Sequence, residues 1–87
     1  MSEIFSMNMD AKATRNLNII YYCDNNRHLI CEPYLKENLH KMAKDLNIKH
    51  CWFHKDHYDI PKRRIEEITN KCILVETKTI IEIINNV

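Results

Sequence analysis

The sequence predicts a small α/β domain with a mostly parallel sheet, in the order strand, short strand, helix, strand, helix, strand, helix. Short β-branched or aromatic runs alternate with segments in which apolar residues recur at helical spacing. This alternation is typical of strands joined by helical crossovers, which produce parallel pairs. The 87 residues suffice for one small core. We therefore predict a polar N-terminal arm at residues 1–16 and a single domain at 17–87.

The first half of the chain contains two predicted strands and the clearest predicted helix. Residues 17–23 form a β-branched and aromatic run of strand length, and residues 28–31 follow as a shorter strand after a polar turn. Pro33 suits the first turn of a helix. The apolar residues that then recur on one helical face are Leu35, Leu39, Met42, Ala43 and Leu46.

The second half repeats the alternation of strand and helix. Residues 50–53 are predicted as a short buried strand, and Pro61 opens a helix that ends near Asn70. Residues 72–75 form the last predicted strand, and Thr77 is predicted to cap a final isoleucine-rich helix. In parallel sheets, ligands gather outside the carboxyl ends of the strands. Residues 24–28, 56–59 and 76–77 are therefore expected to converge at one edge.

The composition excludes some classes of nucleotide-binding protein. The chain has no glycine, so it contains neither a phosphate-binding P-loop nor a dinucleotide-binding fingerprint. Turns are expected to use asparagine, which tolerates a left-handed backbone, at residues 25–26, 47 and 70. The formal net charge of +1 argues against an extended nucleic-acid surface.

The sequence also bears on the cellular compartment. No basic leader precedes an apolar signal segment, and no apolar run reaches the roughly 20 residues of a membrane span, so we expect a cytoplasmic protein without a membrane partner. The four cysteines are widely spaced and are predicted to be reduced and buried. Heavy use of Asn, Ile and Lys without Gly is typical of an AT-rich genome, such as that of a phage.

The stretch from His54 to Pro61 contains the greatest density of chemically active side chains. It reads His-Lys-Asp-His-Tyr-Asp-Ile-Pro and combines carboxylates, imidazoles and a phenol. Lys62, Arg63 and Arg64 follow in the first turn of the predicted helix, where basic side chains and free backbone N–H groups favour phosphate. The segment therefore marks a site, although no single reaction demands this order of residues.

Several of these residues resemble the pattern of a small bacterial and phage domain family of unknown function. The pattern comprises a strand ending in aspartate, a His-Leu pair, a Leu-His pair on a helix and a D-H-Y-D-hydrophobic-P motif. The resemblance covers roughly residues 17–84, and the glycine-containing loop of the family is replaced here by Asn25-Asn26-Arg27. The matching positions are Asp24, His28, His40, Asp56, His57, Tyr58, Asp59 and Arg64.

These positions make up the predicted site. We assign catalytic roles to His57 and Asp56, and predict no metal ligand. The remaining six, which are predicted to bind the ligand, are Asp24, His28, His40, Tyr58, Asp59 and Arg64. The favoured function is binding of a phosphate-bearing small molecule or nucleotide, with Tyr58 or Trp52 against a base. The sequence does not determine whether a reaction follows or whether a cofactor binds.

Three other hypotheses remain. Asp24, His28, Asp56 and His57 mix carboxylate with imidazole, so a metal-dependent phosphodiester hydrolase is an alternative. The domain is also compatible with a non-enzymatic interaction protein, such as a phage-encoded inhibitor, or with a homodimer formed through its last helix. Finally, the motif is compatible with a purely structural role, in which Asp59 caps a helix, Tyr58 anchors the core edge and Arg64 pairs with Asp56 to brace the loop.

Overall fold

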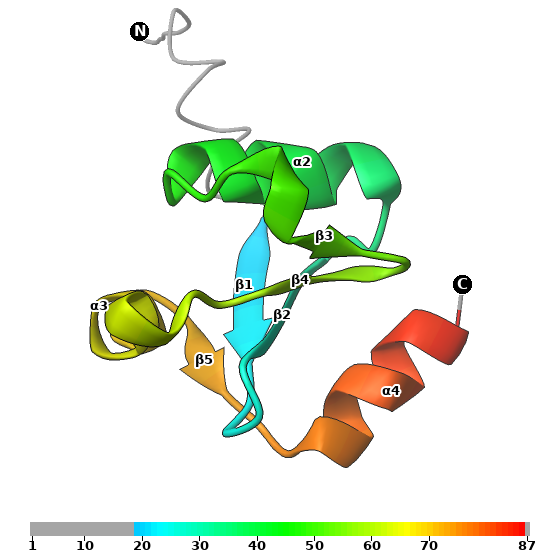
Figure 1. Cartoon of the computed structure of the whole chain (residues 1–87). Helices are drawn as coiled ribbons and strands as arrows, with labels where there is room; N and C mark the ends of the chain where they lie inside the picture. Colours follow the sequence, from blue (N-terminus) through cyan, green and yellow to red (C-terminus); the bar gives the residue numbers. More distant parts are fainter. Residues whose placement is uncertain (1–18, 87) are drawn as a thin grey trace, which may run out of the picture.

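The computed structural model describes residues 19–86, which fold into one sheet with helices on both faces (Figure 1). The five strands are ordered β3-β4-β2-β1-β5 across the sheet. Their bounds are β1 Ile20–Cys23, β2 His28–Glu32, β3 Phe53–His54, β4 His57–Asp59 and β5 Ile73–Leu74. The predicted arm at residues 1–16 lies outside the described residues.

The α/β class was predicted correctly, but the prediction of a mostly parallel sheet was wrong. The pairs β1–β2, β2–β4 and β3–β4 are antiparallel, and β1–β5 is parallel. The turn at residues 24–27 and the turn at 55–56 are too short for a helical crossover, so each of them joins antiparallel neighbours. Residues 57–59, predicted as part of a loop, instead form the strand β4.

The helices begin and end close to the predicted positions, with local differences. The helices are α2 Lys36–Asp45, α3 Ile65–Thr69 and α4 Thr77–Asn85. Two 3-10 turns, η1 His50–Trp52 and η2 Lys62–Arg64, replace most of a predicted strand and the start of a predicted helix. Pro33 precedes α2 rather than opening it. Thr77 starts α4 without capping it, because its hydroxyl donates to the Asp24 carboxylate instead.

The period-two alternation of strand residues divides the sheet into two faces. Leu29 and Tyr58 are cross-strand neighbours on the face covered by α2. His28 and His57 lie on the opposite face, where α4 packs. The buried apolar core comprises Cys23, Leu29, Ile30, Cys31, Leu39, Met42, Ala43, Leu46, Ile48, Tyr58, Ile60, Ile68 and Ile80.

Most of the α4 isoleucines pack against the core of the domain. Ile80 is buried and Ile84 is half-buried, whereas Ile81 is 51% exposed. Ile73 and Leu74 of the edge strand β5 are each 52% exposed, so apolar surface also remains at that edge. The predicted homodimer stays a prediction. None of the described helices is both long and apolar enough to cross a membrane.

Because the chain has no glycine, other residues take the left-handed backbone conformation in its turns. Asn47 has φ 59° at the end of α2, as its position in the sequence predicts. Arg27 and Lys55 have φ 69° and 62° and take the same conformation in the two tight turns. Neither Arg27 nor Lys55 is an asparagine. The expectation that asparagine takes the left-handed conformation in turns therefore identified only Asn47.

The cysteines are free thiols, and the prediction that all are buried was wrong for Cys51, which is exposed. Cys23 and Cys31, in β1 and β2, are buried, and Cys72 is half-buried. Burial raises the pKa of Cys31 and Cys72 to about 12, so these two thiols stay protonated and unreactive near neutral pH.

Candidate functional site

Asp24 is a buried carboxylate at which three segments of the chain meet. Its Oδ2 accepts hydrogen bonds from Thr77 Oγ1 at 2.6 Å and from the His28 ring at 2.8 Å through Nδ1. Its Oδ1 accepts the backbone N–H groups of Asn26 and His28, both at 2.9 Å. Because β1 and β5 are parallel, their carboxyl ends place Asp24 beside Thr77. Distant residues therefore converge here, as the sequence predicts.

The hydrogen bonds of Asp24 outweigh its burial. Burial alone raises the pKa of a carboxyl group, but the hydrogen bonds from Thr77, His28 and Asn26 lower the pKa of Asp24 below its ordinary value. Asp24 is therefore an anion at neutral pH. It fixes the orientation of the His28 ring through Nδ1.

His57 lies between two carboxylates. Its Nδ1 is 2.8 Å from Oδ1 of Asp56, in the preceding turn, and its Nε2 is 3.2 Å from Oδ1 of Asp59, two residues further along β4. The contact with Asp56 has the geometry of a hydrogen bond, whereas the longer contact with Asp59 is a proximity of opposite groups. His57 is therefore oriented by Asp56, with its Nε2 facing Asp59.

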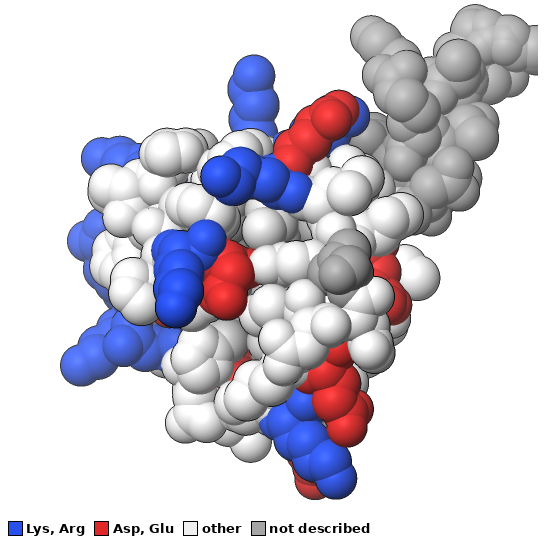
Figure 2. Space-filling view, turned by 90° about the vertical axis from the view of Figure 1, so that its right-hand side faces the viewer, with Lys and Arg blue, Asp and Glu red and all other residues white. Residues whose placement is uncertain are grey.

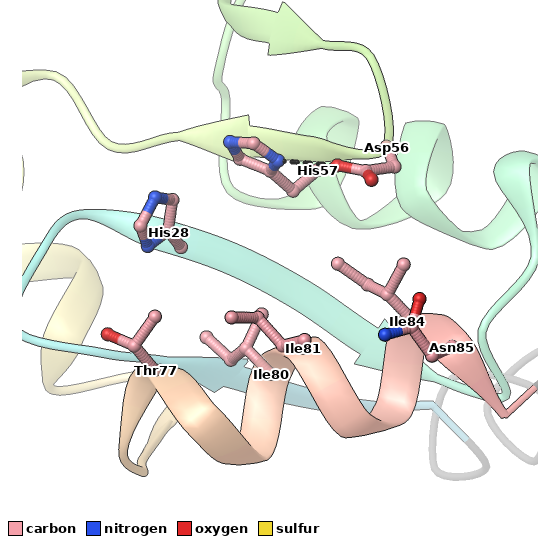
Figure 3. A pocket seen from close by; sticks show the side chains of 8 residues that line it. All are labelled: His28, Asp56, His57, Thr77, Ile80, Ile81, Ile84 and Asn85. Atoms are coloured by element: carbon pink, nitrogen blue, oxygen red, sulfur yellow. Dashed lines mark hydrogen bonds and ion pairs between the residues drawn. The ribbon is translucent and has the colours of Figure 1, made fainter.

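The two histidines form the polar wall of a cavity of about 200 Å³. Their ring centroids are 4.9 Å apart and the rings are nearly perpendicular, at 83°. Figure 3 shows them with Asp56 on one side of the cavity and the α4 residues on the other. The facing wall consists of Thr77, Ile80, Ile81, Ile84 and Asn85. We name this space the histidine cavity.

Two predicted ligand-binding residues lie on the other face of the sheet. The Tyr58 hydroxyl is 2.8 Å from Nδ1 of His40, a residue of α2. Tyr58 is only 1% exposed and belongs to the core, and burial raises the pKa of its hydroxyl. His40 also packs against Phe53 and His50. Neither Tyr58 nor His40 lines the histidine cavity.

Arg64 is also separate from the cavity. Its Nη1 and Nη2 donate to the carbonyl oxygens of Asn47 and Leu46 at 2.7 Å each, which ties η2 to the end of α2. Its Nη2 lies 2.8 Å from Oε2 of Glu67, and not beside Asp56 as the structural hypothesis supposed. Arg64 lines a second hollow, together with Trp52.

The structure thus brings together five of the eight predicted residues. They are the two histidines, His28 and His57, and the three carboxylates that contact them, Asp24, Asp56 and Asp59. The sequence analysis did not predict the wall of the histidine cavity that α4 supplies, including Asn85 and the isoleucines. The sequence could have indicated this wall. A helix that follows a strand parallel to β1 returns across the sheet next to Asp24. Ile80, Ile81 and Ile84 were interpreted only as helix core or dimer contact.

The carboxylates and imidazoles considered for a metal site contact one another in this structure. Among the described residues, no three His, Cys, Asp or Glu side chains are placed so that they could share one metal ion. The two nitrogens of His57 already face carboxylates, and Nδ1 of His28 faces Asp24.

A family comparison covers most of the described chain. The model of the family described as protein of unknown function (DUF4031) matches residues 21–85. The chain belongs to this family. No curated protein and no solved structure matches it. The resemblance to a small domain family of unknown function is thus confirmed, and the DUF4031 match itself assigns no role to any residue of the histidine cavity.

The role of Arg64 as a brace leads to a stability prediction for this DUF4031 domain. Arg64→Lys keeps the charge but loses the planar fork that reaches two carbonyl oxygens and Glu67 together. We expect the midpoint of thermal unfolding to fall by about 5 °C. Arg63→Lys, at the exposed neighbouring position, should leave it unchanged. Equal midpoints for the two variants would contradict the bracing role.

Proposed function

We propose that the domain binds a small phosphate-bearing molecule in the histidine cavity. The observation that carries the proposal is the position of His57, which borders the cavity and is held between two carboxylates beside a second histidine. A protonated imidazole binds anions through its N–H groups. His57 is therefore the group that would meet the phosphate.

The two contacts of His57 are unequal, and this inequality explains how an anion could enter. The Asp56 contact is 2.8 Å long and has hydrogen-bond geometry, whereas the Asp59 contact is 3.2 Å long. A phosphate oxygen would replace the longer contact, at Nε2. The Asp56 contact would remain and keep the ring oriented.

The size and lining of the cavity limit the ligand. Small-molecule sites usually occupy roughly 300–1,000 Å³. The cavity of about 200 Å³ is smaller, so it suits a phosphate group with a short apolar substituent against Ile80 and Ile84 rather than a whole nucleotide. The Asn85 amide and the Thr77 hydroxyl add polar groups at the ends of the α4 wall.

The test is a titration with inorganic phosphate, followed by NMR of the histidine ring signals. We expect the His57 and His28 signals to shift together and saturate, and His57→Gln to weaken binding at least tenfold. The matched control is His50→Gln, because His50 is exposed and contacts His40 on the other side of the sheet. Binding that is unchanged in His57→Gln would reject the proposal.

Acid–base turnover of the bound ligand is a second candidate, favoured by the Asp24–His28 pair. A buried carboxylate that accepts from Nδ1 leaves Nε2 of the neutral ring as a free base, the geometry used by many hydrolytic sites. His57 would supply the acid when its ring is protonated. General acid–base groups contribute about 10²–10⁴-fold to rate.

Turnover has its own measurement. With an activated phosphodiester as substrate, His28→Gln is expected to lower the rate about 100-fold, a loss within the range for one acid–base group. Phosphate binding should fall much less in that variant, because His57 is intact. Absence of any turnover by the unmodified protein would exclude the enzymatic candidate and leave the binding proposal standing.

A further inference from the structure

A second hollow, separate from the histidine cavity, gathers basic side chains beside an aromatic ring. It has a volume of about 430 Å³ and lies between η1 and η2. Its basic lining residues are Lys49, Lys62, Arg63 and Arg64, and Trp52 and Pro61 line it as well. None of the described residues that line it is acidic. We call it the basic groove.

The charge of this groove contrasts with the balanced charge of the whole chain. The formal net charge is +1, so the positive lining reflects local placement rather than composition. The four basic residues that line the groove, with no acidic residue among the lining, make this local excess of positive charge. Figure 2 shows Lys and Arg side chains projecting along the left-hand edge of the face that it draws. Such a local field attracts anions.

Arg64 holds the groove in shape. Its guanidinium connects η2 with the carbonyl oxygens of Leu46 and Asn47 at the end of α2, and these elements supply opposite walls. The side chains of Lys49, Lys62 and Arg63 are exposed and extend from walls that are already fixed. A preorganised groove loses less entropy when it binds a ligand.

Trp52 supplies the second half of a recognition surface. It is half-buried in η1, so part of its indole packs against the core while another part faces the groove. An indole face stacks on nucleobases of any sequence, and lysine or arginine side chains neutralise the adjoining phosphate. The volume falls within the roughly 300–1,000 Å³ of ordinary small-molecule sites.

We propose that the basic groove binds a nucleotide unit, with the base stacked on Trp52 and the phosphate held by Lys49, Lys62 and Arg63. This site is independent of the proposed function of the histidine cavity, because the two share no lining residue. The unit could come from a free mononucleotide or from a single-stranded nucleic acid. Both sources present the same phosphate and base.

Trp52 makes the test direct, since it is the only tryptophan in the chain. Its fluorescence is titrated with adenosine monophosphate, with a single-stranded oligonucleotide of about ten nucleotides, and with inorganic phosphate. The two nucleotide ligands are expected to quench the emission and inorganic phosphate is not. Tighter, strongly salt-dependent binding of the oligonucleotide identifies a nucleic-acid strand as the source, whereas equal affinities identify the free nucleotide.

Two variants separate this proposal from general charge effects. Lys62→Gln/Arg63→Gln is expected to weaken nucleotide binding at least tenfold and to leave the phosphate shifts of His57 unchanged. Lys36→Gln/Lys78→Gln removes the same charge from exposed positions outside the groove and should bind as the unmodified protein does. Trp52→Leu, followed by the anisotropy of a labelled oligonucleotide, should also lose affinity, and Trp52→Phe should retain part of it.

Three results would overturn the proposal. The first is an emission spectrum that neither nucleotide ligand changes. The second is an affinity for Lys62→Gln/Arg63→Gln equal to that of the unmodified protein, and the third is an equal loss in the two double variants. Because the substituted lysines and arginines are exposed, these outcomes do not depend on whether a Trp52 variant folds.

Discussion

Asp24→Ala is expected to lower the free energy of unfolding by about 3 kcal/mol or more. The carboxylate is buried and accepts hydrogen bonds from Thr77, from the His28 ring and from two backbone N–H groups. Alanine would remove the acceptor that these four donors share, and the His28 and Thr77 groups are only partly exposed to water. Each donor left unpaired away from water costs roughly 1–3 kcal/mol. The measurement is urea-induced unfolding at neutral pH, with the unfolding free energies of the two proteins compared.

A matched aspartate provides the control. Asp45 is exposed and accepts one hydrogen bond, from the Tyr21 hydroxyl at 2.8 Å. Asp45→Ala should cost less than about 1 kcal/mol, because water replaces the lost partner. If the two alanine variants lose similar stability, then Asp24 is not the junction that joins β1, β2 and α4.

The lowered pKa of Asp24 gives this junction a pH dependence of definite sign. A group whose folded pKa is depressed stabilises the fold above its unfolded pKa, about 3.9 for aspartate. That contribution is lost as the pH falls through the depressed folded value. The unmodified protein should therefore lose stability more steeply in acid than Asp24→Asn, whose side chain does not titrate.

The parallel pairing of β1 with β5 is the part of the topology through which the sequence predicted that Asp24 and Thr77 lie side by side. A strand ending at Asp24 and another ending before Thr77 were expected to meet, and their side chains are 2.6 Å apart. The prediction succeeded because both strands are short apolar runs with polar residues at their carboxyl ends. It did not depend on the direction of the remaining strands, which was wrong.

The error in the rest of the sheet has a physical cause in β4. His57, Tyr58 and Asp59 alternate polar and aromatic side chains and lack the apolar run that indicates a buried strand. Their pairing with β2 is stabilised by cross-strand neighbours distant in sequence, such as Leu29 opposite Tyr58. In a loop, all the side chains of the motif could lie near one site. In a strand, alternate side chains point to opposite faces of the sheet.

That alternation also separates the predicted site residues. His57 and Asp59 lie on the α4 side with His28, and Tyr58 lies on the α2 side with His40. Composition cannot reveal this division, because all these residue types are common in functional sites. Only the register of β4 against β2 determines which side chains meet.

The core position of Tyr58 leads to the second large effect. Tyr58→Ala is expected to lower the free energy of unfolding by about 3–5 kcal/mol, as for other buried aromatic rings. That is a large share of the roughly 5–15 kcal/mol by which small domains are stable. Thermal unfolding should show a markedly lower midpoint, because the ring packs between Leu29, Phe53 and the helix α2.

Tyr58→Phe distinguishes a core residue from a ligand-binding one. It keeps the ring and removes only the hydroxyl that contacts His40, so we expect a loss of about 1 kcal/mol. Phosphate binding at the histidine cavity should be unchanged, because Tyr58 faces the opposite side of the sheet. The contrary result, lost phosphate binding with an unaltered unfolding midpoint, would return Tyr58 to the ligand site and require the β4 strand to open when the ligand binds.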